Sequence, residues 1–167
     1  RLRELGVALK RVCIVPDEEA AIVDELQRVA ASYDHVFTSG GVGPTHDDIT
    51  LACVAKAFDQ PLRRHERLAE VLTSHFKDRL RPEHLRMADL PAEATLIEEG
   101  KISWPVVQVR NVYVLPGVPG LFRDKFDAIS ERFRQGAFFL RSVYIDADEG
   151  EVAGTLKRLE TEHEVEV

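Results

Sequence analysis

Cysteine is scarce in this sequence, which holds only Cys13 and Cys53 among its 167 residues. Both lie in apolar patterns, so we expect two buried thiols rather than a disulfide or a pair of metal ligands. Long hydrophobic runs are also lacking: no stretch approaches the ~20 apolar residues of a membrane span, and no secretory signal pattern is visible. Together these absences predict a cytoplasmic protein without a membrane partner.

The sequence also has fewer basic than acidic residues. The 22 lysines and arginines against 29 acidic residues give a formal net charge of −7, which argues against nucleic acid or an anionic membrane surface as the main partner. A hydrophobic content of 44% and a charged content of 31% are ordinary for a soluble globular protein. The length suits one domain with a small appendage.

The two ends of the sequence look incomplete. Residues 1–6 begin without methionine and resemble the last turn of a helix closed by a glycine cap. Residues 164–167 alternate like the first residues of a strand. We therefore expect a fragment that lacks structure at both ends, with part of any active site outside it.

Strand and helix patterns alternate along the chain. This alternation predicts an α/β fold: a three-layer, mostly parallel sheet with helices on both faces, formed by residues 1–135. Residues 136–167 are expected to begin a small C-terminal α+β subdomain. The expected strands are residues 7–15, 35–38, 95–97, 106–109, 112–115 and 138–145. The expected helices are residues 18–32, 48–58, 65–80, 121–134 and 149–162, with residues 81–93 irregular.

Residues 39–50, Ser-Gly-Gly-Val-Gly-Pro-Thr-His-Asp-Asp-Ile-Thr, form a glycine-rich turn between an expected strand and an expected helix. The glycines permit positive φ angles and remove side chains that would keep a ligand from the backbone. Unpaired N–H groups at the start of the next helix then face an anion, assisted by the helix dipole. The turn predicts a phosphorylated small-molecule ligand. The residues expected to bind it are Ser39, Gly40, Gly41, Val42, Gly43, Thr45 and Thr50.

A second turn, Leu-Pro-Gly-Val-Pro at residues 115–119, follows another expected strand. In a parallel sheet the loops after the carboxyl ends of the strands share one edge, where ligands bind. We therefore add Pro116, Gly117 and Pro119 to the expected ligand-binding residues. The first turn has no lysine after its glycines and does not match Gly-x-Gly-x-x-Gly, which disfavours a nucleoside-triphosphate P-loop and a nicotinamide dinucleotide fold.

Asp47 and Asp48 stand at the start of the helix after the first turn. Acids in this position cap free N–H groups and favour the helix dipole, contributing about 0.3–1 kcal/mol. A role as metal ligand or in ligand binding is an equally good interpretation of the residues alone. Because successive helical residues point about 100° apart, both acids do not serve the same cap and one stays available. His46 is expected to be an exposed turn residue.

Two further features have a structural and a functional interpretation. Trp104 next to Pro105 is typical of packing, with stacking on a ligand ring as the alternative. A basic cluster is favoured as a solvated face, with a lid that carries charge to a phosphate or to a neighbouring subunit as the alternative. The cluster consists of Arg63, Arg64, His65 and Arg67.

The first turn followed by the second resembles the paired motifs of the molybdopterin-binding fold. Within that family the chain is most similar to the branch with competence/damage-inducible protein A (CinA) and the N-terminal domain of eukaryotic FAD synthase. The similarity covers roughly residues 1–134, and the tail resembles the extra subdomain of this branch. The resemblance implies an α/β sheet with its pocket at the glycine turn, in a homo-oligomer that is a dimer or trimer.

The resemblance also implies two kinds of activity. Molybdopterin-handling relatives bind pterin phosphate and ADP in this pocket and adenylylate the pterin with Mg²⁺, and the acid of their turn aligns with Asp48. CinA-like and FAD-synthase-linked relatives are associated with cleaving ADP-ribose or FAD with a divalent metal. The expectation is therefore a nucleotide pyrophosphatase that uses Mg²⁺ or Co²⁺, with Asp48 and Asp47 as catalytic and metal-binding residues. The alternatives are a non-catalytic module for molybdopterin or another pterin phosphate, and a degenerate interaction domain.

Two departures from the family pattern affect this expectation. The Gly-Asp-Glu and Asp-Thr-Asn segments that supply a second catalytic acid in relatives are missing from the sequence. The Gly-Thr-Ala-Pro-Gly segment of CinA proteins is also missing between Ile97 and Val114. Residues 104–113 stand in its place and resemble the FAD-synthase-linked type, which disfavours molybdopterin synthesis.

Overall fold

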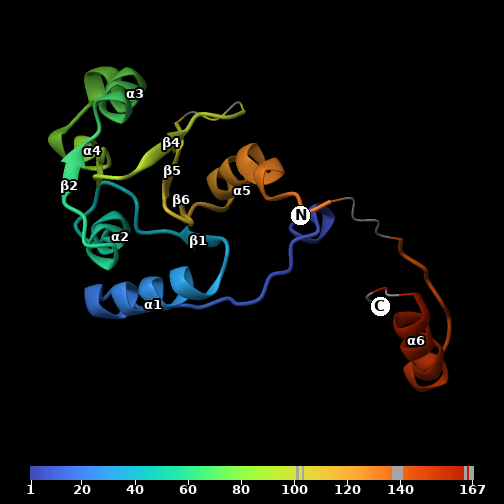
Figure 1. Ribbon diagram of the computed structural model, residues 1–167. Coiled ribbons are helices and arrows are strands. Elements are labelled where there is room, and N and C mark those ends of the chain that lie inside the picture. Colours follow the sequence, from blue (N-terminus) through green and yellow to red (C-terminus); the bar gives the residue numbers. More distant parts are fainter. Residues whose placement is uncertain (101, 103, 137–140, 164, 166–167) are drawn as a thin grey trace.

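The computed structural model describes residues 1–167 except 101, 103, 137–140, 164 and 166–167 (Figure 1). Short 3₁₀ turns lie at Arg3–Leu5, Lys77–Arg79 and Ser130–Phe133. The helices are α1 (Glu19–Ser32), α2 (Thr50–Ala57), α3 (Glu66–Phe76), α4 (Pro82–Arg86), α5 (Pro119–Ile129) and α6 (Glu149–His163). The strands are β1 (Val36–Ser39), β2 (Leu62–Arg64), β3 (Asp89–Pro91), β4 (Thr95–Ile97), β5 (Val106–Val109) and β6 (Val112–Leu115).

The main sheet has the strand order β1-β6-β5-β4. The α/β class is confirmed, but the pairing is mixed rather than mostly parallel. Only β1 and β6 are parallel, while β5 pairs antiparallel with both β4 and β6. The reason is the two-residue connection of β5 and β6, which forces a hairpin. Within it Arg110 has a φ of 53°, and the Asn111 side-chain amide donates to the carbonyls of Ala30 and Tyr33 at 3.0 and 2.8 Å.

Alternate residues of the strands face two separate cores, as the two-residue period of a strand requires. Val112 and Val114 of β6 pack with α1, α2 and α3, whereas Tyr113 and Leu115 pack with α5 and Phe133. Helices α1 and α2 therefore cover one face of the sheet and α5 covers the other (Figure 1). This three-layer arrangement places the carboxyl ends of β1 and β6 side by side.

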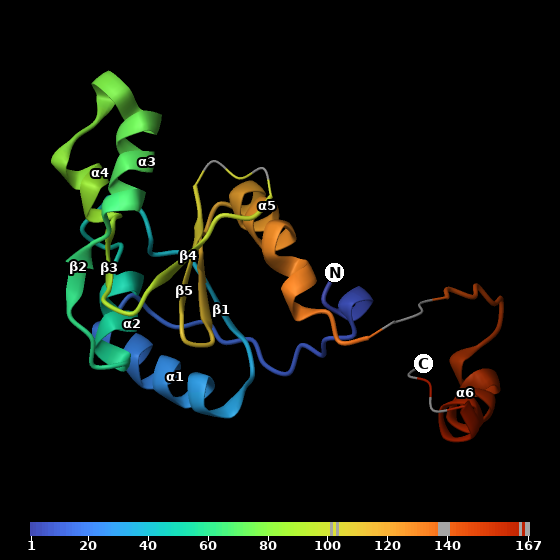
Figure 2. The ribbon, with the colours of Figure 1, turned by 45° about the horizontal axis from the view of Figure 1, so that its top comes forward.

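A small second layer of structure lies beside the main sheet, built from β2, β3, α3 and α4 (Figure 2). Strands β2 and β3 pair antiparallel. Residues 81–93, expected to be less regular than the rest, hold the short elements α4 and β3, which were not predicted. The helix expected over residues 65–80 ends at Phe76, where Lys77 has a φ of 48° and breaks the helical path.

Residues 7–15, expected to be a strand, have no strand hydrogen bonding and run along the surface. Their apolar side chains stay in solvent: Leu9 is 66% exposed and Ile14 is 99% exposed. A strand needs a neighbour to pair with, and none of the described segments pairs with residues 7–15. Cys13 lies in this segment and is exposed, so the expectation of two buried thiols was wrong for Cys13 and right for Cys53.

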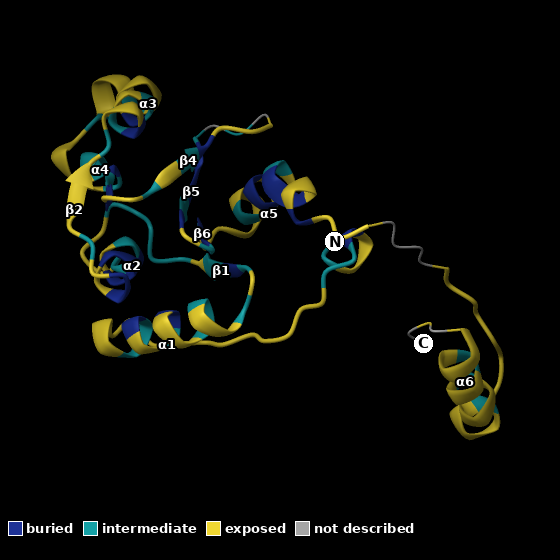
Figure 3. Ribbon diagram, viewed as in Figure 1, coloured by how far each residue is buried: buried dark blue, intermediate teal, exposed yellow. Residues whose placement is uncertain are grey.

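The C-terminal tail carries one helix, α6, which matches the expected helix 149–162 and has no buried residue (Figure 3). Residues 141–145 are not a strand, although a strand was expected over 138–145. Its remaining residues 138–140, and most of the expected strand start at 164–167, lie outside the described residues. Within the described parts of the chain, no helix has the length and apolarity to cross a membrane.

Candidate active site

The glycine turn begins directly at the carboxyl end of β1. The Gly40 N–H donates to the Leu115 carbonyl at 3.1 Å, which continues the pairing with β6 for one residue. Gly40 and Gly41 then adopt φ angles of 103° and 64°, a region that costs other L-residues about 1–2 kcal/mol. A Cβ at Gly41 would lie 2.3 Å from Thr50 Oγ1. The turn is therefore closed so tightly that only glycine fits at residue 41.

Thr50 holds the turn together from the first residue of α2. Its hydroxyl donates to the Gly40 carbonyl at 2.9 Å, and its N–H donates to the Gly41 carbonyl at 3.0 Å. The residue is 9% exposed. The Thr50 hydroxyl thus braces the glycine turn in this structure rather than facing outward.

Asp48 is fixed by the residues before it. Its Oδ2 accepts hydrogen bonds from the Thr45 N–H at 2.9 Å and from the Thr45 hydroxyl at 2.5 Å. Partial burial raises the pKa of the Asp48 carboxyl, but hydrogen bonds from Thr45 and from the Gly43 N–H outweigh it, so the pKa is lowered overall. Asp48 is therefore ionised at neutral pH. A Cβ at Gly43 would lie 2.6 Å from Asp48 Oδ2.

Asp47 and His46 lie on the open side of the turn and are exposed. The neighbouring Thr45 side chain, followed by the backbone N–H of Asp47 itself, lowers the pKa of the Asp47 carboxyl. The described residues show no side-chain hydrogen bond that caps α2, whose N-cap is Ile49. Both carboxylates are therefore used in the turn rather than as caps of the helix. The expectation of an exposed His46 is confirmed.

The second turn meets the first at a backbone contact. A Cβ at Gly117 would lie 3.2 Å from the Cα of Gly40, so a side chain there would push the two turns apart. The Ser39 hydroxyl donates to the Pro116 carbonyl at 3.5 Å across the same gap. Gly117 and Pro119 are exposed, and α5 begins at Pro119. The structure thus brings the two predicted turns together on one solvent-open rim.

Backbone donors remain available on this rim. Within the described part of the chain, the N–H groups of Gly41 and Val42 have no hydrogen-bond acceptor. Both residues are half-buried. Consecutive unpaired N–H groups that open toward solvent are typical of an anion-binding concavity.

Two of the four residues of the basic cluster, Arg64 and Arg67, form ion pairs. Arg64 makes two contacts with Asp89, at 2.5 and 3.2 Å, and Arg67 makes two with Glu98, both at 3.0 Å. These pairs join β2 to β3 and α3 to the residue that follows β4. Trp104 packs with its ring centroid 4.8 Å from that of His75. These contacts favour the structural interpretation of both features.

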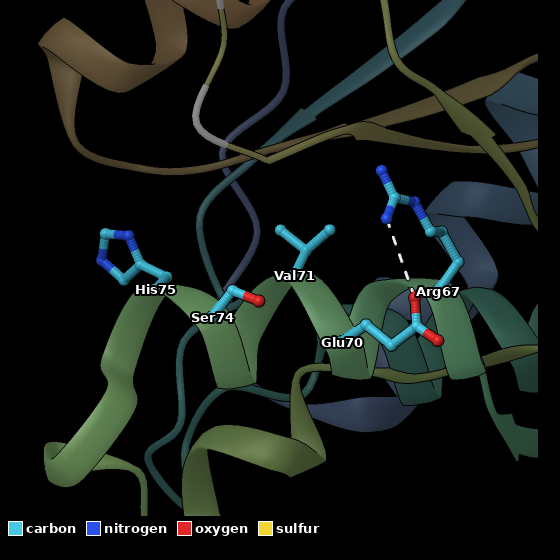
Figure 4. Close-up of a pocket in the computed structure, with 5 residues that line it drawn as sticks. All are labelled: Arg67, Glu70, Val71, Ser74 and His75. Atoms are coloured by element: carbon cyan, nitrogen blue, oxygen red, sulfur yellow. Dashed lines mark ion pairs between the residues drawn. The ribbon is translucent and has the colours of Figure 1, made fainter.

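The sequence analysis did not identify two further polar features. A hollow of ≈ 630 Å³ on α3 is lined by Arg67, Glu70, Val71, Ser74 and His75 (Figure 4). These residues have the three- and four-residue spacing of one helix face, so the pattern was available in the sequence. Lys125 on α5 is only 7% exposed, and its ammonium donates to the carbonyls of Trp104 and Pro105 at 2.9 and 2.6 Å. No pattern in the sequence marks Lys125, because a helical lysine is normally exposed.

A comparison with protein families shows which family the chain belongs to. The family model described as a probable molybdopterin binding domain matches residues 1–135, which include both turns. This chain belongs to that family. The molybdopterin-binding domain thus carries the glycine turn, the second turn and the complete main sheet.

Named relatives come from the two branches that the motifs suggested. A probable FAD synthase from Caenorhabditis briggsae is 33% identical over 89% of this chain and 34% of its own length. A CinA-like protein from Myxococcus xanthus is 33% identical over 92% of this chain and 41% of its own length. A crystal structure of CinA from Thermoplasma acidophilum, of unknown function, is 29% identical with a TM-score of 0.69, and covers 77% of this chain and 79% of that chain.

These relatives confirm the resemblance to CinA and FAD synthase and the α/β fold of the molybdopterin-binding domain. The chain spans about a third of the FAD synthase relative and about two fifths of the CinA-like one. What either whole protein does is therefore carried over only as a proposal.

Proposed function

We propose that the domain binds a phosphorylated nucleotide or pterin at the glycine turn. The observation that carries this proposal is the pair of unpaired N–H groups at Gly41 and Val42, opposite the exposed Gly117. A phosphate oxygen accepts hydrogen bonds from such groups without any cationic side chain. Ser39 and the second-turn residues Pro116 and Pro119 form the outer edge of the same site.

We further propose that the site cleaves a nucleotide pyrophosphate such as ADP-ribose or FAD with the help of Mg²⁺ or Co²⁺. Among the described residues no group of three or more metal-ligating side chains is gathered. Asp48 and Asp47 nevertheless fit Mg²⁺, because this ion is commonly held by one or two carboxylates together with substrate phosphates. A divalent ion in this position would supply positive charge at the phosphates and a more acidic bound water.

The reaction would be hydrolysis of the phosphoric anhydride. Water adds to one phosphorus, the bridging P–O bond breaks, and a proton is released. ADP-ribose gives AMP and ribose 5-phosphate, and FAD gives AMP and FMN. The turn contributes by orienting the phosphates on Gly41 and Val42, and Asp48 contributes a carboxylate that is already ionised at neutral pH.

A second candidate function is a non-catalytic module for molybdopterin or another pterin phosphate. Two observations favour it: the description of the matching family model, and the limitation of the turn to two carboxylates. In either form, we propose that the protein is cytoplasmic and assembles as a dimer or trimer. The exposed apolar side chains of Leu9, Val12 and Ile14 support such an assembly.

The test is chromatography of the protein after incubation with ADP-ribose or FAD, with and without Mg²⁺ or Co²⁺. We expect AMP only with metal, and at least a hundredfold less AMP from Asp48→Asn, an order-of-magnitude loss for a metal-binding or reacting group. Asp24→Asn, at an exposed aspartate of α1, serves as the matched control and should keep the rate. AMP formation that is unchanged in Asp48→Asn would remove the proposed role of Asp48. Saturable binding of a pterin phosphate without any product would favour the second candidate.

A further inference from the structure

A second hollow, of ≈ 400 Å³, lies at the corner where α3 ends and α4 begins. None of its residues belongs to the glycine turn or to the second turn. The residues that line it are Phe76, Asp78, Arg79, Leu80, Arg81 and His84.

The hollow carries positive charge that the protein itself leaves uncompensated. Arg79 and Arg81 form no ion pair with any residue that the structure describes, whereas Arg64 and Arg67 are each paired with a carboxylate. Residues 77–86 contain four basic and two acidic residues, a net charge of 4 − 2 = +2 within a chain of net charge −7. Asp78 in the lining offsets one of the two guanidinium charges. The remaining charge favours an anion.

A histidine in the lining is held in a fixed orientation. The rings of Phe76 and His84 stack with centroids 3.8 Å apart and an interplanar angle of 1°. The Arg81 N–H donates to Nδ1 of His84 at 3.1 Å. Because Nδ1 accepts a hydrogen bond, the proton of the neutral ring is assigned to Nε2, which is then a donor. The ring stack and the Nδ1 contact together keep that donor in place.

The backbone that presents the two arginines is strained. Lys77 has φ 48° and ψ −124°, a conformation that costs a residue other than glycine about 1–3 kcal/mol and is typical of functional segments. This sharp turn at Lys77, the first residue of the 3₁₀ turn, ends α3 and changes the direction of the chain after Phe76. Arg79 and Arg81 line the same hollow as Phe76 for this reason.

We propose that this hollow binds a phosphate-type oxyanion of a small molecule. The guanidinium groups of Arg79 and Arg81 bind its oxygens, since their planar donor pairs match this geometry, and His84 Nε2–H donates a further hydrogen bond. The site is independent of the glycine turn and of the activity proposed there. It gives the domain two separate positions for phosphate groups.

The test is a titration of the full chain with inorganic pyrophosphate, followed by ¹H–¹⁵N spectra of the backbone amides and arginine side chains. We expect saturable shifts of the signals of residues 78–84. The double variant Arg79→Gln/Arg81→Gln should weaken this binding at least about tenfold, because both positive charges and their hydrogen bonds to the anion are lost. Arg86→Gln is the matched control: Arg86 is exposed on α4, does not line the hollow and should leave the binding unchanged.

The signals of Gly41 and Val42 report the glycine turn separately, so failure of one site is distinguished from failure of the other. An unchanged response in Arg79→Gln/Arg81→Gln would overturn the proposal. An equal loss in Arg86→Gln would also overturn it, since diffuse surface charge would then be responsible. Saturation by an acidic peptide with no response to pyrophosphate would assign the hollow to a polypeptide partner instead. Thermal unfolding of each variant checks that all of them are folded.

Discussion

Gly41 is the residue on which the candidate site depends most. Its φ is 64°, and a Cβ added at this residue would lie 2.3 Å from Thr50 Oγ1, which leaves no room for a side chain. Gly41→Ala should therefore destabilise the domain by roughly 2–4 kcal/mol, the sum of the backbone strain and a lost buried hydrogen bond. Chemical denaturation measures this change, and calorimetry with ADP-ribose measures the accompanying loss of binding.

Gly120 provides the matched control at the start of α5. A Cβ there would meet nothing within 4 Å, and its φ is not positive. Gly120→Ala should be neutral or stabilising by up to about 1 kcal/mol, because alanine favours a helix. Equal stability of Gly41→Ala and the wild type would show that the turn relaxes easily, contrary to the geometry.

At residue scale, the sequence predicted a glycine-rich turn at residues 39–50 but not the hydrogen bonds within it. The glycines at residues 40–43 predict a turn open to an anion, because few other residues adopt positive φ. Two hydrogen bonds depend on the exact path of the turn: the Thr50 hydroxyl donates to the Gly40 carbonyl, and the Thr45 hydroxyl donates to Asp48. Both side chains have equally good alternative partners nearby in the sequence, so spacing alone does not choose between them.

At the scale of elements, Lys125 links α5 to the segment before β5. Burial without a carboxylate partner lowers the pKa of the Lys125 ammonium from 10.5 to about 8. The folded state therefore releases this proton at a lower pH than the unfolded state does. Between these two values the unfolded chain binds more protons, so the free energy of unfolding rises with pH. The gain should be about 1 kcal/mol between pH 8 and pH 9.

Urea unfolding at pH 7.5, 8, 8.5 and 9 measures this gain. The raised pKa of the Cys53 thiol opposes the trend once the unfolded thiol begins to ionise, around its ordinary value of 9.0, so the window ends at pH 9. Lys125→Met should remove the rise, whereas Lys157→Met, at an exposed lysine of α6, should keep it. A rise of the same size in Lys125→Met would assign the effect to another group.

The elements that the sequence predicted correctly are those with a full periodic pattern and a definite start or end. Helix α1 belongs to this group because it buries one repeating set of apolar residues, and strands β5 and β6 belong to it because they are predominantly apolar runs on either side of the turn at Arg110 and Asn111. Strands β2 and β3 have three residues each and were missed. Residues 7–15 were expected to form a strand, but pairing depends on two segments, and none of the described segments pairs with them.

At the scale of the whole molecule, stability comes from the two cores on either side of the main sheet. All residues of both cores lie between Leu2 and Phe133. The Gln135 N–H donates to the Leu5 carbonyl at 2.8 Å, which closes the N-terminal turn onto the end of the domain. Helix α6 contributes no buried residue. The residues after 136 therefore add little to the free energy of unfolding.

A chain that ends at residue 136 should accordingly unfold within about 2 °C of the 167-residue protein. A chain that ends at residue 128 is the informative comparison, because it loses Ile129 and Phe133, which are 0% and 2% exposed. Removing two such side chains costs several kcal/mol, roughly 2–5 for each, and should abolish cooperative unfolding. Differential scanning calorimetry of the three chains measures both effects. A large loss of stability in the 136-residue chain would mean that α6 packs against the domain in solution. The half-buried side chains of α6, Val152, Leu156 and Leu159, would then make that contact.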